Sequence, residues 1–216
     1  MGTPSILIDI VCELKTASLT GLTETEDGRI GSVFDEKAII DFLQNTTKFS
    51  NKIVKPDKRK FYDMLVIDGA NSYPINIKTT TGKIPDNAFN KLSFLYAFTD
   101  LSENELGNSV RDKKFISLIT TRKKDLDRDY FYLCIDKNDN TNITIRGLKE
   151  INCWCPNANP SNILQIDWKK EHNLPDLTLP FDVVYTKLVI NGVFKCYADR
   201  AEVWSAAIDI YNSENY

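Results

Sequence analysis

Residues 61–83 read FYDMLVIDGANSYPINIKTTTGK. Two apolar runs flank an Asp-Gly pair in this stretch, and that pattern predicts a β-hairpin. Side chains alternate between the faces of a strand, so Asn76 and Lys78 share one face while the isoleucines beside them share the other. A lysine inside an otherwise buried strand is costly unless an anionic group accompanies it. Lys78 therefore marks this hairpin as the candidate functional site.

Helical and extended patterns alternate on both sides of this hairpin. They predict an α/β (α+β) fold in which helices flank a mixed central β-sheet. Residues 147–182 read as irregular, with loops around short elements. The expected helices are 4–17, 32–44, 87–98 (capped by Asp86) and 198–212, and the expected strands are 61–67, 73–79, 115–121, 130–136, 141–145 and a second hairpin at 188–195.

The length and composition are those of one globular domain. The chain has 216 residues, of which 42% are apolar and 26% charged. It contains no apolar run long enough for a membrane helix, and its first residues, MGTPSILIDIVCEL, lack the basic start of a signal peptide. Five cysteines without a zinc-site spacing suggest reduced thiols, so we expect a cytoplasmic protein.

Charge is segregated along the chain although the formal net charge is only −3. Residues 24–41 are acidic, whereas residues 48–60 and 111–128 are basic. Either basic run alone is most often a solvated loop. Two such runs flanking one candidate site favour a groove for a polyanion.

Two acids near the hairpin complete the candidate site. Asp63 begins the first strand of the hairpin, and Glu36 falls within the apolar arc of the helix predicted at 32–44. The helix cap and dipole account for Asp35 but not for Glu36, which is either part of an ion pair or part of a site. Two carboxylates and a lysine suit Mg²⁺-assisted phosphodiester hydrolysis, because carboxylates hold the metal and a lysine orients water and stabilises charge on phosphorus.

Asp63 followed by Asn76-Ile77-Lys78 resembles the motif of the PD-(D/E)xK nucleases, and INIKTT after a strand bearing Tyr-Asp is similar to type II restriction endonucleases. The resemblance implies an αβββαβ core at about residues 30–136, within a single nuclease-like domain spanning 1–216. A C-terminal extension, 147–216, would hold irregular loops, a hairpin and a helix. The resemblance also implies cleavage of double-stranded DNA at a short specific sequence, with Mg²⁺ as cofactor and a homodimer as the working unit.

Asn76 stands where this family usually carries a second acid. Three explanations are open. Glu36 supplies the missing carboxylate, so that Asp63, Asn76 and Glu36 hold the metal; or the acid was replaced by its amide and catalysis is weakened; or the domain binds DNA without cutting it. A repair or junction-resolving nuclease of the same fold is a further alternative.

The residues after Lys78 are of types that contact DNA. Hydroxyls and lysines bind phosphates, and asparagine reads adenine edges. Each of these residues is explained equally well as an ordinary surface polar residue near the start of a capped helix. His172, the single histidine, lies in a polar context and is expected at the surface. The candidate DNA-binding residues are Thr79, Thr80, Thr81, Lys83, Asn87, Asn90 and Lys91.

Overall fold

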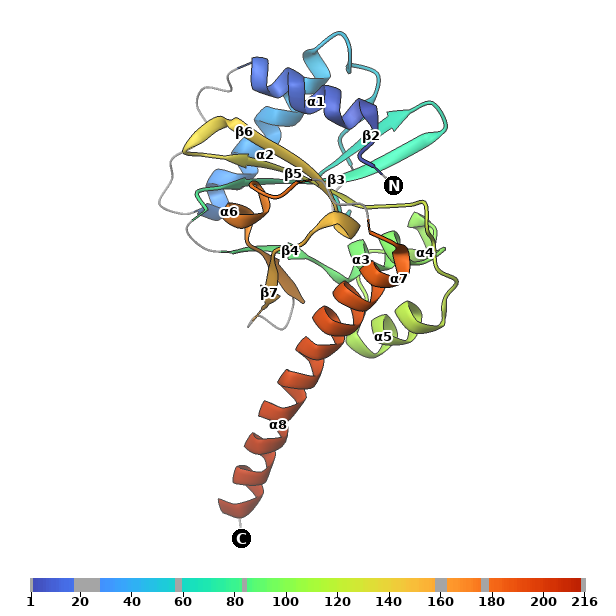
Figure 1. Cartoon of the computed structure of the whole chain (residues 1–216), viewed down its shortest axis with the longest axis vertical. Helices are drawn as coiled ribbons and strands as arrows, with labels where there is room; N and C mark the ends of the chain where they lie inside the picture. The colour runs from blue at the N-terminus through green and yellow to red at the C-terminus, as the bar shows by residue number, and fades with distance from the viewer. Residues whose placement is uncertain are drawn as a thin grey trace.

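A five-stranded mixed sheet forms the centre of the protein, with helices on both faces (Figure 1). The computed structural model describes residues 2–17, 28–56, 60–82, 85–157, 163–175 and 179–214. Strands β3 and β5 run parallel, and the other neighbours in the sheet are antiparallel. In spatial order the strands are β1 (Ile53–Val54), β2 (Met64–Asp68), β3 (Asn71–Thr80), β5 (Phe131–Asp136) and β6 (Asp139–Gly147).

The expected hairpin at 61–83 is confirmed as β2 and β3. Gly69 forms the turn at a φ of 62°, a backbone angle that suits glycine because it has no Cβ. Met64, the first residue of β2, pairs with Ile75. In the described part of the chain, residues 76–80 of β3 therefore pair with β5 on one side and have no strand partner on the other. The hairpin ends in an open strand edge where Asn76 and Lys78 lie.

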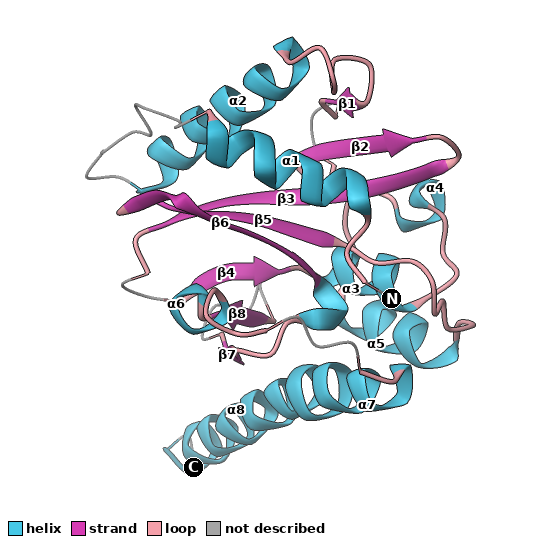
Figure 2. Ribbon diagram, turned by 45° about the horizontal axis from the view of Figure 1, so that its top comes forward, coloured by secondary structure: helices cyan, strands magenta, loops and turns pink. Residues whose placement is uncertain are grey.

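Two helices cover one face of the sheet (Figure 2). They are α1 (Ser5–Thr16) and α2 (Gly28–Asn45). The apolar side chains that β3 and β5 direct to this face pack against them in one core. Alternation explains why this core takes the odd-numbered residues of both strands. Its members include Ile10, Leu14, Ile39, Leu43, Ile75, Ile77, Leu133 and Ile135.

The opposite face packs against helices and a second, three-stranded antiparallel sheet. A long helical segment then closes the chain and projects from the body (Figure 1). The elements of this layer are β4 (Asp86–Phe89), α3 (Lys91–Phe98), α4 (Glu103–Leu106), α5 (Asp112–Thr121), η1 (Leu148–Glu150), β7 (Trp154–Pro156), β8 (Leu164–Ile166), α6 (Trp168–Glu171), α7 (Phe181–Tyr185), the π-helical η2 (Thr186–Phe194) and α8 (Lys195–Glu214).

The strand expected at 115–121 is wrong, because these residues belong to helix α5. Phe115 and Ile119 are both fully buried and lie four residues apart, which is one helical turn. Ile116 and Ser117, which lie between them, are exposed. The apolar spacing was therefore helical, and the β-branched residues of this segment misled the prediction.

The helix expected at 87–98 begins later than predicted. Residues 86–89 form β4, which pairs with β8 in the second sheet. Helix α3 starts at Lys91, and Asn90 caps it by accepting a hydrogen bond from the Ser93 backbone N–H at 2.8 Å. Pairing with a strand distant in sequence overrode the local preference for a helix.

The second hairpin, expected at 188–195 within the C-terminal extension, is also wrong. The segment is helical and continues into α8. A Cβ on Gly192 would lie 3.1 Å from Leu164 and 3.3 Å from Trp154, so glycine lets the helix approach the second sheet closely. The Asn-Gly pair thus reflects close packing and not a turn. None of the described helices combines the length and the apolar character needed to cross a membrane.

Candidate active site

Asp63 immediately precedes the first residue of β2 and lies next to the open edge of β3. Its carboxylate accepts a hydrogen bond from the Ile77 backbone N–H at 2.8 Å, in place of the strand partner that β2 no longer supplies. This contact holds the carboxylate beside Asn76 and Lys78. Burial raises the pKa of Asp63, while the positive charge of Lys78 and the bond from Ile77 act against that rise.

Glu36 reaches the same place from helix α2. Burial, and then the negative charge of Asp63, raise its pKa to about 7, with the positive charge of Lys78 opposing the shift. A charge influences a neighbour measurably only over a short distance. Glu36 of α2, Asp63 just before β2 and Lys78 of β3 therefore form one electrostatic cluster, in which each charge influences the others.

Asp35 has a role that the sequence did not indicate. Helix α2 begins at Gly28, so Asp35 lies in its middle and is not part of an N-terminal cap. The side chain is 1% exposed, accepts a hydrogen bond from the Thr79 hydroxyl at 3.0 Å and pairs with Lys137 Nζ at 2.7 Å. These contacts tie α2 to the ends of β3 and β5, and they hold the neighbouring Glu36 at the cluster.

Asn76 presents a buried amide to the site. Its side chain hydrogen-bonds the Tyr130 hydroxyl, whereas its carbonyl oxygen Oδ1 is buried without a partner among the described residues. An unpaired buried oxygen fits a hard cation such as Mg²⁺, which prefers oxygen ligands. No three His, Cys, Asp or Glu side chains in the described ranges are arranged to hold a metal together. A cation here would need the amide of Asn76 or water to complete its shell.

Asp86 is an acid that the sequence prediction used only as a helix cap. It begins β4, where its carboxylate accepts a hydrogen bond from the Thr80 hydroxyl and lies within the field of Lys78. Burial raises the pKa of Asp86. Asp86 follows Lys78 by only eight residues and comes soon after the end of β3, which was the one signal in the sequence that it lies near the site. The sequence did not show that the chain reverses direction between these two residues.

Several of the candidate DNA-binding residues are occupied by contacts within the protein. The hydroxyls of Thr79 and Thr80 bind Asp35 and Asp86, Asn90 caps α3, and Lys91 pairs with Asp112 at 2.6 Å. Thr81 is exposed. Lys83 and the side chain of Asn87 lie outside the described residues. The structure therefore brings together the acids and the lysine of the predicted site but gives many of the surrounding polar residues other partners.

Several cations of the two basic runs have partners within the described part of the protein. From the first run, Lys48, Lys52 and Lys60 pair with acids. From the second, Arg122 pairs with two acids, and the guanidinium of Arg128 donates to backbone carbonyls. Lys113 and Lys114 are exposed on α5. The paired cations stabilise the fold and are less available to a polyanion, which weakens the case for a groove lined by both runs.

His172 is partly buried and not at the surface as expected. It hydrogen-bonds Thr144, and burial lowers its pKa. Its Nε2 atom is buried without a partner in the described chain. The residue lies on the α6 side of the molecule and takes no part in the cluster around Lys78.

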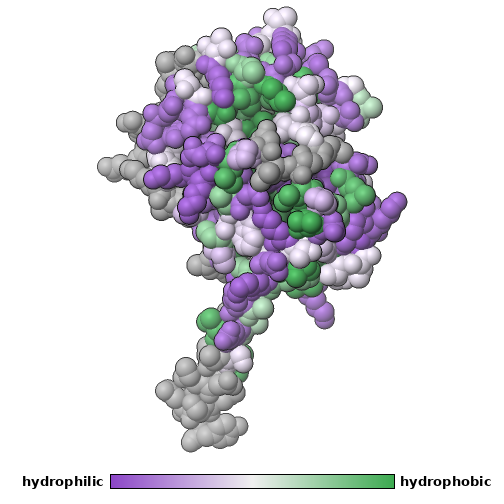
Figure 3. All heavy atoms as spheres, in the orientation of Figure 1, coloured by the Kyte–Doolittle hydropathy of each residue, from purple (hydrophilic) through white to green (hydrophobic). Residues whose placement is uncertain are grey.

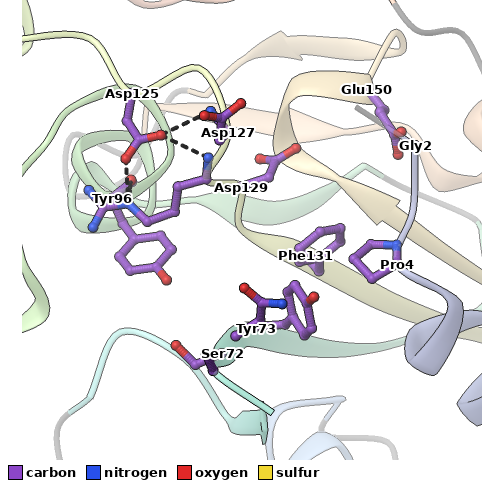
Figure 4. A pocket seen from close by; sticks show the side chains of 13 residues that line it. Gly2, Pro4, Ser72, Tyr73, Tyr96, Asp125, Asp127, Asp129, Phe131 and Glu150 are labelled. Carbon is purple, nitrogen blue, oxygen red and sulfur yellow. Dashed lines mark hydrogen bonds and ion pairs between the residues drawn. The ribbon is translucent and has the colours of Figure 1, made fainter. Parts of the chain in front are cut away.

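A cavity of about 440 Å³ lies at the other end of β3 and β5 (Figure 4). Ser72 and Tyr73 line it, five or six residues before Lys78, together with Phe131 at the start of β5. Its remaining lining includes Asp125, Asp127, Asp129 and Glu150. Burial raises the pKa of Asp129 to about 7. This acidic cavity does not suit a phosphate, and it is separate from the cluster around Lys78.

Comparison with models of known protein families finds none that matches this chain. A search of curated proteins likewise finds no significant match. The interpretation of the site therefore rests on its own geometry and chemistry.

Proposed function

We propose that this protein is a Mg²⁺-dependent endonuclease that hydrolyses phosphodiester bonds of double-stranded DNA at a short specific sequence. The observation that carries the proposal is the electrostatic cluster of Glu36, Asp63 and Lys78 at the open edge of β3. The succession of α2, β1, β2, β3, α3 and β5 supports the αβββαβ core expected for PD-(D/E)xK nucleases, with β4, α4 and α5 as additional elements between β3 and β5. In this proposal Lys78 takes the position of the motif lysine.

Each residue of the cluster has a defined task in this proposal. Asp63 and Glu36 would hold Mg²⁺ with their carboxylates, and Asn76 would add its unpaired carbonyl oxygen. The bound ion would polarise the scissile phosphate and acidify a water molecule. Lys78 would orient the attacking water and stabilise the charge that builds on the phosphate oxygens. Glu36 thereby supplies the carboxylate that Asn76 lacks.

The proposal includes a homodimer. One such cluster would cleave one DNA strand. A palindromic site has two-fold symmetry, so two copies of the protein related by a two-fold axis are the simplest way to cut both strands. Mixed-sequence plasmid incubated with Mg²⁺ should then yield discrete double-strand fragments. Nicks or cleavage confined to branched DNA would instead indicate a structure-specific nuclease.

Replacing Lys78 tests the assignment directly. We expect Lys78→Met to lower cleavage by about 10²-fold or more, because a positioned proton-transfer group contributes that much. Lys195→Ala is a suitable control, since Lys195 is an exposed lysine of α8 paired with Asp199. Unchanged cleavage by Lys78→Met, with both variants folded, would refute the role given to this residue.

A further inference from the structure

The cavity at the start of β3 and β5 has the size and the lining of a binding site for a small cation (Figure 4). Its volume of about 440 Å³ lies within the range of about 300–1,000 Å³ that is usual for small-molecule sites. Four of its described lining residues are acids and one is a base. The acids are Asp125, Asp127, Asp129 and Glu150, and the base is Arg128.

The cations near this cavity are engaged elsewhere. The guanidinium of Arg128 donates to the Tyr96 carbonyl at 2.8 Å and to the Leu101 carbonyl at 2.7 Å, and it lies 3.6 Å from Asp125. Lys149 donates its Nζ to the backbone carbonyls of Asp125 and Arg128. The cavity therefore keeps an excess of negative charge.

Glu150 is a buried acid with one oxygen left for a ligand. The residue is only 8% exposed and lines the cavity. Its Oε2 accepts hydrogen bonds from the Gly147 N–H at 3.0 Å and the Thr3 hydroxyl at 3.4 Å, whereas Oε1 accepts none from the described residues. A largely buried carboxylate oxygen without a donor is destabilising, so a cationic donor in the cavity would be favourable.

Asp129 lies next to Glu150. A Cβ on Gly147 would collide with Asp129 Oδ2 and would lie 3.4 Å from Glu150 Oε2, so both carboxylates border the same backbone position. Burial raises the pKa of Asp129 to about 7, the charge of Glu150 adds to the rise, and the charge of Lys149 opposes it. Two carboxylates this close repel each other unless a proton or a cation lies with them.

Aromatic rings complete the wall of the cavity. Tyr73 and Phe131 both line it, and their rings meet edge to face with centroids 5.9 Å apart and an interplanar angle of 86°. Aromatic faces attract ammonium groups, and they pack against the methylene groups of an alkyl amine. A metal ion would gain nothing from these rings, because Mg²⁺ and Ca²⁺ take oxygen ligands.

We propose that this cavity binds a linear aliphatic polyamine, with one ammonium group held by Asp129 and Glu150 beside the rings of Tyr73 and Phe131. The excess of acids favours a ligand that has several positive charges and no anionic group. Asp127, at the exposed part of the lining, would face a second ammonium group. The proposal is independent of the nuclease function, because it uses none of the residues around Lys78.

Calorimetric titration of the metal-free protein with spermidine tests the site. We expect Glu150→Gln to weaken spermidine binding by about 10-fold or more, because it removes one charge of a largely buried pair. Glutamine keeps the acceptor for the Gly147 N–H and so preserves the local fold. Asp199→Asn, which removes an exposed acid of α8, is the matched control and should bind spermidine as the unaltered protein does.

Two further measurements keep the test independent of one variant. Tyr73→Leu retains an apolar side chain but removes the ring, and it should weaken spermidine binding by about 5-fold. Because the ammonium group binds the ionised form of Asp129, affinity should rise about tenfold from pH 6 to pH 8, and Asp129→Asn should abolish most of this rise.

The possible results decide between a polyamine site and its alternatives. Equal spermidine affinity in Glu150→Gln and the unaltered protein would overturn the proposal, as would equal losses in Glu150→Gln and Asp199→Asn, which would indicate adsorption to acidic surface. Loss of Mg²⁺ binding, but not of spermidine binding, in Glu150→Gln would make the cavity a metal site. Free lysine, whose carboxylate the acids repel, should bind more weakly than spermidine, and equal binding would contradict the charge argument.

Discussion

Asn76 is the residue on which the proposed chemistry depends most. Its side chain is a neutral amide, and its Oδ1 is buried and unpaired among the described residues. An amide in this position lowers the repulsion between acids that would otherwise crowd one space. The charge of the site then comes from Asp63 and Glu36, two residues on different elements.

Asn76→Asp should bind Mg²⁺ more tightly than the unaltered protein, because a third carboxylate adds negative charge. Under the proposed mechanism cleavage should not rise, since Glu36 would already supply the second carboxylate. Calorimetric titration with Mg²⁺ and plasmid cleavage measure the two effects. A large gain in cleavage would show instead that the asparagine had disabled the site.

Glu36 should make stability depend on pH. Its pKa is about 7 in the folded protein against an ordinary value of 4.5. The folded state therefore binds the extra proton between these values, so the contribution of Glu36 to stability falls as pH rises from about 4.5 to 7. Asp63 and Asp86, whose pKa values are also raised, act in the same direction.

Thermal melts with a chelator at pH 5 and pH 8 check this prediction. Glu36→Gln should lose less stability between these pH values than the unaltered protein. Added Mg²⁺ should raise the melting temperature of the unaltered protein more at pH 8, where Glu36 is ionised and able to bind it. Equal pH dependence in both proteins would contradict the burial of Glu36.

Helix α2 is the element that completes the site, and one buried ion pair fixes it. Asp35 binds Thr79 from β3 and Lys137 from the end of β5. A helix attached to two strands in this way cannot slide along the sheet without breaking both contacts. Glu36 follows Asp35 in the chain, so the position of the acid is set by the anchor beside it.

Asp35→Ala should destabilise the protein by about 3–5 kcal/mol, because it removes the acid that pairs with the mostly buried ammonium group of Lys137. The double variant Asp35→Leu/Lys137→Met should recover most of this loss, since an apolar pair of similar size replaces both charges. Urea denaturation measures the three free energies. The exposed pair Lys37 and Asp41 on the same helix offers a control, and Asp41→Ala should cost less than about 1 kcal/mol.

The whole molecule has a compact body and a projecting helix (Figures 1 and 3). Early in α8, the Tyr197 hydroxyl donates to Asp112 and Arg200 donates to the Asn157 carbonyl. Further along, Val203 is 67% exposed and Ile208 is 57% exposed. The start of the helix is therefore anchored, whereas these later apolar side chains face solvent.

Ending the chain after Glu202 should change the melting temperature by less than about 2 °C, because the removed side chains that the structure describes, among them Val203 and Ile208, are exposed. Thermal unfolding of both forms checks the expectation. Light scattering on the same samples reports whether the removed part of α8 holds two copies together. A fall of about 5 °C or more would mean that this part of the helix is packed in solution.

Strands were predicted correctly where apolar and polar residues alternate strongly along the chain. The predictions failed where packing against distant elements determined the secondary structure. The hairpin of β2 and β3, strand β5 and helices α1 and α8 follow from local patterns. Helix α5 and the helical segment around Gly192 do not, because their apolar residues and glycine were equally compatible with strands. Asp35 and Asp86 could not be placed from sequence, since their partners Lys137 and Thr80 come from other parts of the fold.

The sequence alone identified Asp63, Lys78 and Glu36 as a group, because a lysine in a buried strand and an acid in an apolar helical arc both violate local burial rules. Tertiary structure decided how they meet. Strand β2 starts too late to pair with the end of β3, which opens an edge for Asp63 and Glu36, and β4 brings Asp86 to the same face. Strand register and chain reversal set these distances, and neither is encoded in any short stretch of residues.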